Sequence, residues 1–179
     1  MNKLILTLIF FIVYPQNSTW KKIHDEREYS ISGASKFKDG FLVVHDNKKK
    51  GQARVSYIDE ELKITDLIWP EIKLPIDLEA AIQVPETMNR YILMESDGKC
   101  FEITIDPKDL RLDVIHTFTL PLIKPEMNLE GLTIFPSGQG LIFIYGDRGS
   151  NSRPSTLFTS FFNKAEKKFY DTNQFIFDL

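Results

Sequence analysis

The chain has 179 residues, of which 42% are hydrophobic and 12% aromatic, so it can build a folded core and does not belong to the disordered class. Its 22 Lys and Arg residues nearly balance 25 Asp and Glu residues, and a net charge of −3 provides no overall field that would gather nucleic acid. The single cysteine, Cys100, excludes an internal disulfide framework and a zinc site that needs paired thiolates.

Residues 1–18 have the composition of an export signal. Lys3 supplies a positive charge, residues 4–13 (LILTLIFFIV) are almost entirely apolar, and a polar stretch (PQNST) follows. Two weaker alternatives are a membrane anchor and a buried first strand. The apolar run is shorter than the ~20 residues of a membrane-spanning helix, which argues against the anchor. We predict a signal peptide at 1–18, export to the periplasm or the medium, and no transmembrane span in the mature chain.

Residues 19–179 have the pattern of an all-β domain. Short runs rich in Val, Ile, Phe and Tyr alternate with Gly, Asp, Asn and Pro clusters, and no window has a sustained helical period. Asp39-Gly40 and Asp97-Gly98 predict hairpin turns in which glycine takes a positive φ. The predicted strands are 31–37, 41–45, 54–58, 63–69, 81–84, 91–95, 100–105, 113–120, 132–135, 141–145, 156–162 and 174–178.

Three segments of similar layout follow one another along the chain. Each has a short head, a strand, a turn, a second strand and a polar corner, and the heads recur about every 50 residues, the period of propeller blades. We predict about three four-stranded antiparallel blades, in repeats at approximately 28–70, 75–121 and 126–179. Because propellers close with four to eight blades, the domain is expected to be a partial β-propeller-like fold that self-associates through unpaired blade edges. The heads are Ser32-Gly33-Ala34, Glu79-Ala80-Ala81 and Glu130-Gly131-Leu132.

The heads and the polar corners should share one face. In an antiparallel blade, the corner that enters the first strand lies at the same end as the corner between strands two and three. Carboxylates there would ring a channel mouth and suit calcium, which takes oxygen ligands. The alternative is a structural role, in which these acids accept backbone N–H groups and fix the turns. The metal candidates are Asp46, Asp77, Glu79, Glu95, Glu130 and Asp147.

The same face would carry cations on its loops. Guanidinium and ammonium groups beside a metal would hold a small anionic ligand such as a phosphate ester. The anion-binding candidates are Lys48, Arg54, Arg148 and Arg153. The sequence contains no nucleophile elbow, phosphate loop, zinc-protease motif or EF-hand loop, so catalytic residues are not assigned. Of the three histidines, His45 is of interest because it lies at a repeat corner.

A set of short segments carries a family resemblance: 31–34 (ISGA), 41–47 (FLVVHDN) with 54–56 (RVS), 77–80 (DLEA), 94–96 (MES), and 128–132 (NLEGL) with 146–149 (GDRG). These segments resemble the esterase-like-activity-of-phytase family, a group of exported β-propeller-like proteins. They occur in the right order across most of residues 31–163 and correspond to the N-terminal half of the family's members. The resemblance implies a calcium-assisted phosphoester or ester hydrolase. The alternatives are a non-catalytic extracytoplasmic module that binds a ligand or a protein, and a truncated fragment without function.

Overall fold

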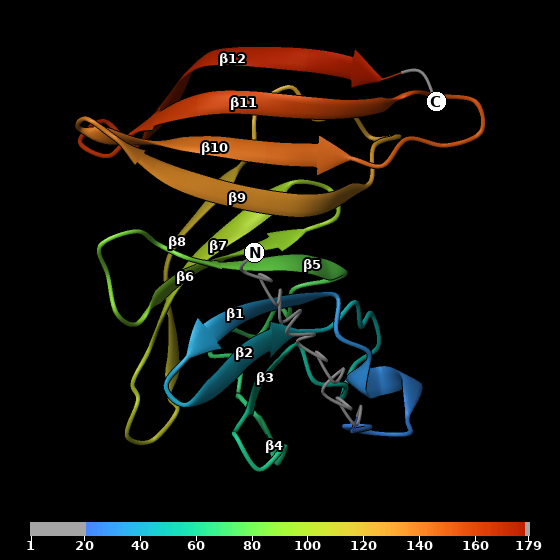
Figure 1. Cartoon of the computed structure of the whole chain (residues 1–179), viewed down its shortest axis with the longest axis vertical. Coiled ribbons are helices and arrows are strands. Elements are labelled where there is room, and N and C mark those ends of the chain that lie inside the picture. Colours follow the sequence, from blue (N-terminus) through green and yellow to red (C-terminus); the bar gives the residue numbers. More distant parts are fainter. Residues whose placement is uncertain (1–20, 178–179) are drawn as a thin grey trace, which may run out of the picture.

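The computed structural model describes residues 21–177 and contains three four-stranded antiparallel sheets, each built from consecutive strands (Figure 1). The first sheet holds β1 (Gly33–Phe37), β2 (Gly40–Val44), β3 (Val55–Ile58) and β4 (Ile64–Asp66). The second holds β5 (Leu78–Gln83), β6 (Arg90–Glu95), β7 (Lys99–Ile105) and β8 (Leu112–Thr119). The third holds β9 (Leu129–Ser137), β10 (Gly140–Asp147), β11 (Ser155–Asn163) and β12 (Lys168–Phe177).

The predicted all-β class with three propeller-like blades is confirmed, and the three sheets form an open array. A short 3₁₀ turn, η1 (Arg27–Tyr29), precedes the first sheet. Within residues 21–177, no helix has the length and apolar character to cross a membrane. The predicted signal peptide at 1–18 lies outside the described residues.

The first strands of the three sheets lie side by side, because β1 contacts β5 and β5 contacts β9. At the first of these contacts, a Cβ added to Gly33 would lie 2.8 Å from the Cα of Ala80, closer than real Cβ atoms approach. The Ser32 hydroxyl also donates to the carbonyl oxygen of Leu78 at 2.5 Å. The first head therefore contains glycine because the backbones of β1 and β5 approach closely there.

The second sheet is covered on both faces, and this explains its nearly continuous apolar sequence. Side chains alternate between the faces of a strand, so Tyr91 and Leu93 of β6 pack against the first sheet while Ile92 and Met94 pack toward the third. All four are almost fully buried. Cys100 of β7 is buried in the core that the second and third sheets share, where it packs as a small apolar residue.

Two local predictions need correction. Glu79 and Glu130 were expected in corners before their strands, but β5 begins at Leu78 and β9 at Leu129, so both glutamates lie inside the first strands. Gly40 does not take a positive φ; Lys38 does, with φ 51°. Gly40 is required because an added Cβ would meet the carbonyl oxygen of Ile58 on β3. Gly98, in contrast, has the predicted positive φ of 83°.

Candidate functional site

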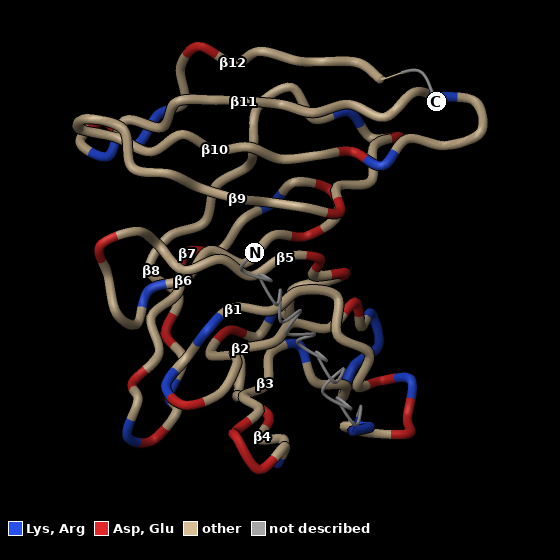
Figure 2. Tube along the Cα trace, viewed as in Figure 1, with Lys and Arg blue, Asp and Glu red and all other residues tan. Residues whose placement is uncertain are grey.

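One end of the sheets, here called the corner face, gathers most of the predicted site residues. It consists of the segments that enter the first strands and the corners after β2, β6 and β10. Figure 2 shows acidic and basic segments close together at this end, near the starts of β5 and β9 and the end of β10. The corner face comprises residues 45–48, 76–79, 95–97, 128–130 and 146–148.

Glu79 and Glu130 occupy the same structural position in successive sheets, because each is the extra residue of a β-bulge. In the second sheet Leu78 pairs with Glu95 and Ala80 with Met94, which leaves Glu79 unpaired between them. In the third sheet Leu129 pairs with Asp147 and Gly131 with Gly146, which leaves Glu130 unpaired. A bulge redirects the side chain of its extra residue, and bulges are over-represented beside functional sites.

The bulges bring Glu79 close to other acids of the corner face. Partial burial, followed by the negative charges of Glu130, Asp77 and Asp46, raises the pKa of the Glu79 carboxyl to about 7, while the positive charge of Lys48 opposes the shift. Within residues 21–177 the Glu79 carboxylate has no ion-pair partner. Glu79 is therefore an acid that is ionised only in part near neutral pH.

Two other candidate acids, Glu95 and Asp147, each accept a backbone N–H, in a pattern that repeats in successive sheets. The Glu95 carboxylate accepts the N–H of Ile76 at 2.5 Å, and the Asp147 carboxylate accepts the N–H of Asn128 at 2.9 Å. Both acids are buried, with exposures of 7% and 3%. In each pair the acceptor lies 19 residues after the donor. These contacts match the alternative role considered above, in which the acids fix the corners.

Asp46 of the first sheet follows the same spacing but binds a side chain. The Arg27 guanidinium donates two hydrogen bonds to the Asp46 carboxylate, at 3.0 and 2.7 Å. These hydrogen bonds are the main reason that the pKa of Asp46 lies below its ordinary value. Arg27 is not among the predicted site residues, because it lies outside the repeated strands. The separation of 19 residues, which recurs in all three sheets, is the signal that relates Arg27 to Asp46.

Two of the four anion-binding candidates support the backbone. Arg54 is buried and donates to the carbonyl oxygens of Pro75, Gln52 and Lys49, at 2.6 to 3.0 Å. Arg153 forms an ion pair with the buried Asp147 carboxylate and also donates to the carbonyl oxygen of Glu126 at 2.9 Å. Their guanidinium groups are thus already engaged by acceptors of the chain.

The other two anion-binding candidates are exposed and pair with acids. Lys48 Nζ lies 2.9 Å from Asp77 Oδ2, and Arg148 Nη1 lies 3.0 Å from Glu130 Oε1. The Asp77 carboxylate also accepts the hydroxyl of Ser96 at 2.7 Å. Within residues 21–177, four of the six metal candidates therefore form ion pairs with the chain's own cations. Glu95 is bound only by the N–H of Ile76, and Glu79 has no ion pair.

The described residues do not form a ready calcium cage. Calcium takes six to eight oxygen ligands, and the part of the chain from 21 to 177 contains no group of three or more His, Cys, Asp or Glu residues placed to hold a metal. An ion at this face would have to displace Lys48 from Asp77 or Arg148 from Glu130. Calcium binding stays a prediction.

His45 takes part in a buried hydrogen-bond chain that the sequence did not reveal. Its Nδ1 lies 3.0 Å from the carbonyl oxygen of Ser30, and its Nε2 lies 2.9 Å from Ser56 Oγ, which is 2.7 Å from Asp66 Oδ1. Burial lowers the pKa of His45 below its ordinary value. Although serine and histidine side chains meet here, their exposures are 0% and 1%, so the pair joins β2 and β3 to the preceding segment and offers no surface to a substrate.

No protein-family model matches the chain, and no curated protein matches it. The resemblance to the phytase-related family therefore depends on the short motifs quoted above.

Proposed function

We propose that the chain is a non-catalytic, extracytoplasmic binding module whose corner face receives a cationic ligand at Glu79 and Glu130. The single observation that supports this proposal most is the matching β-bulge in β5 and β9, which directs these two carboxylates to one region. The other acids of the face fix corners or pair with the chain's own cations, as expected of a rigid scaffold that presents a site. Glu130 itself pairs with Arg148, so the ligand has to displace this guanidinium from Glu130.

The pKa of Glu79 gives the proposal a physical basis. Like charges from Glu130, Asp77 and Asp46 help raise this pKa to about 7, so the free protein holds part of a proton there at neutral pH. A cation between Glu79 and Glu130 would offset the repulsion and favour the ionised form. Binding should therefore release a proton and strengthen as the pH rises through 7. The cation is either a calcium ion or a basic side chain of a partner protein.

Isothermal titration calorimetry tests the proposal, with CaCl₂ and trilysine as separate probes at pH 7 in Pipes and in Tris. Because the two buffers differ in ionisation enthalpy, proton release appears as a difference in the observed heat. We expect saturable binding of one probe with proton release, and weaker binding without proton release in Glu79→Gln. Glu61→Gln, in an exposed turn between β3 and β4, is the control. If neither probe binds at millimolar concentration, or if Glu79→Gln binds as the wild type does, the proposal is wrong.

A calcium-assisted phosphoester or ester hydrolase is the second candidate. The contact between Arg148 and Glu130 favours it, because a guanidinium beside the acids is the arrangement that would orient an anionic substrate. The test is hydrolysis of 4-nitrophenyl phosphate and 4-nitrophenyl acetate with calcium and with a chelator. Calcium-dependent turnover that is lost in Arg148→Gln would establish this candidate, and no turnover above buffer would dismiss it.

Export is part of the proposal, since it is based on the composition of residues 1–18. N-terminal sequencing of the protein recovered from the periplasm or medium should begin near Thr19. A start at Met1 in exported material would contradict the signal peptide.

A further inference from the structure

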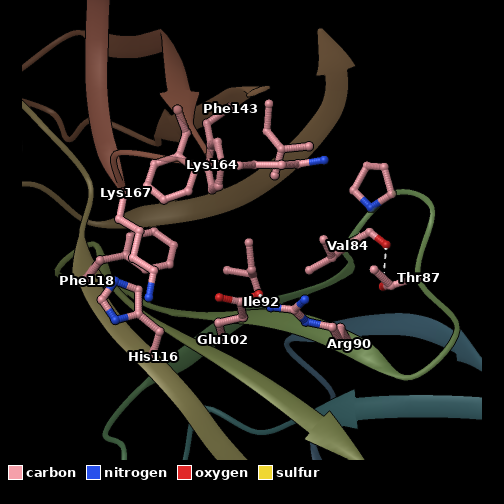
Figure 3. Close-up of a pocket in the computed structure, with 13 residues that line it drawn as sticks. Val84, Thr87, Arg90, Ile92, Glu102, His116, Phe118, Phe143, Lys164 and Lys167 are labelled. Carbon is pink, nitrogen blue, oxygen red and sulfur yellow. Dashed lines mark hydrogen bonds and ion pairs between the residues drawn. The ribbon is translucent and has the colours of Figure 1, made fainter. Parts of the chain in front are cut away.

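A pocket lies between the second and third sheets, at the end opposite the corner face. Its volume is about 240 Å³, and residues of both sheets line it. The turn after β5 and the turn after β11 form its rim, and strands β6, β8 and β10 form its walls. In Figure 3, Arg90 and Glu102 lie on the second sheet at the bottom of the view, whereas Lys164 lies near Phe143 and Lys167 near Phe118 and His116.

The inner wall of the pocket is aromatic and aliphatic. The ring of Phe118, on β8, lies 6.0 Å from that of Phe143 on β10 and 5.8 Å from that of Phe162 on β11. The aliphatic side chains of Ile92 and Leu141 complete this wall. At these separations the three rings pack against one another, and the half-buried rings of Phe118 and Phe162 leave apolar surface that a flat ligand could contact.

The rim carries an excess of positive charge. Arg90 and Glu102 form an ion pair with each other, so they add no net charge. Lys164 and Lys167 line the rim, are exposed, and have no ion-pair partner within residues 21–177. Two ammonium groups at the opening of an apolar cavity would attract an anion.

The two lysines are held in place by a well-bonded turn. The side-chain oxygen of Asn163 accepts the N–H groups of Ala165 and Glu166, at 2.9 and 3.1 Å. The nearest acid of the turn, Glu166, is occupied, because its carboxylate accepts the Asn163 amide at 3.0 Å and the Tyr170 hydroxyl at 2.5 Å. Glu166 therefore binds these two neutral donors and forms no ion pair with Lys164 or Lys167, whose ammonium groups can reach a ligand.

We propose that this pocket binds a small aromatic carboxylate, with the ring against the half-buried Phe118 and Phe162, which the buried Phe143 supports from behind, and the carboxylate at Lys164 and Lys167. The apolar wall selects the ring, and the charge of the rim selects an anion over a neutral or cationic analogue. At about 240 Å³ the pocket is smaller than the roughly 300–1,000 Å³ of sites for drug-sized ligands, which limits the ligand to one ring with a short acidic chain. This site is separate from the corner face and does not depend on the function proposed for it.

The test compares three probes with the same ring and chain length: 3-phenylpropionate, 3-phenylpropan-1-ol and 3-phenylpropylamine. Titrations followed by NMR of methyl groups should show shifts at Val84, Ile92 and Leu141, which line the pocket. The carboxylate should bind at least about 5-fold more tightly than the alcohol, and the amine should bind most weakly. Equal affinity for the three probes, or shifts confined to other methyl groups, would overturn the proposal.

Lys164→Gln combined with Lys167→Gln isolates the contribution of charge. Both side chains are exposed, so the variant should keep the wild-type melting temperature, and Lys49→Gln combined with Lys50→Gln on an exposed loop of the first sheet is the matched control. The Kd for 3-phenylpropionate should rise about 5- to 10-fold in the first variant and stay unchanged in the control. The Kd for the alcohol should not change. A carboxylate Kd that is the same in both variants would show that the lysines do not hold the anion.

Discussion

Replacing Glu79 with glutamine should stabilise the protein at pH 8 and have little effect near pH 4.5. The folded-state pKa of Glu79 is about 7, above the ordinary value of 4.5, so the folded state binds this proton more tightly than the unfolded state does. The contribution of Glu79 to the free energy of unfolding is therefore fully present below pH 4.5 and is lost as the pH rises through 7. Glutamine carries no charge at any of these pH values and removes this dependence.

The magnitude follows from the size of the shift. At 1.36 kcal/mol per pKa unit, ionisation of a fully buried carboxyl with this shift would lower the unfolding free energy by about 3 kcal/mol. Glu79 is partly exposed, and solvent screening reduces the expected effect to about 1 kcal/mol. In a chain of this length that free energy corresponds to a rise of roughly 2–4 °C in melting temperature.

Urea unfolding of Glu79→Gln and wild type at intervals between pH 4 and 8.5 measures this difference, with Glu61→Gln as the control at an exposed turn. The difference in unfolding free energy should be near zero at pH 4 and reach a plateau above pH 8. A difference that is constant with pH, or that is largest at pH 5, would refute the placement of Glu79 among the other acids.

Three further outcomes are expected. Gly33→Ala should lower the unfolding free energy by about 1–3 kcal/mol because its Cβ would meet Ala80, whereas Gly131→Ala, with nothing within 4 Å of the added Cβ, should not; urea titration compares them. Arg153→Met should cost about 3–5 kcal/mol by calorimetry, since it leaves the buried Asp147 without its ion pair. Light scattering of the mature chain should show association that Ile176→Lys reduces, because β12 is an edge strand with exposed apolar side chains. A wild-type chain that stays monomeric at high concentration would contradict the predicted association through β12.

The sequence alone determined the strands and their grouping. Runs such as Tyr91–Met94 are apolar at every position because both faces of their sheet are covered, and Gly98 marks a tight turn through its positive φ. Such signals are local, since a few neighbouring residues contain all the information. The boundaries of strands are less local. β12 begins at Lys168, whereas the predicted start is 174, because the first half of this strand is largely polar and exposed and has no apolar run to mark it.

Only the tertiary structure decided what the polar side chains do. A β-bulge is a mismatch between two strands, so the unpaired positions of Glu79 and Glu130 cannot be read from either strand alone. Arg54 looked like a surface cation, yet it is buried against carbonyl oxygens as distant in sequence as Pro75. The aromatic pocket likewise depends on Phe118 meeting a different sheet. Composition and periodicity fix which residues lie in strands, whereas the partners of a charge or a ring depend on how separate sheets pack.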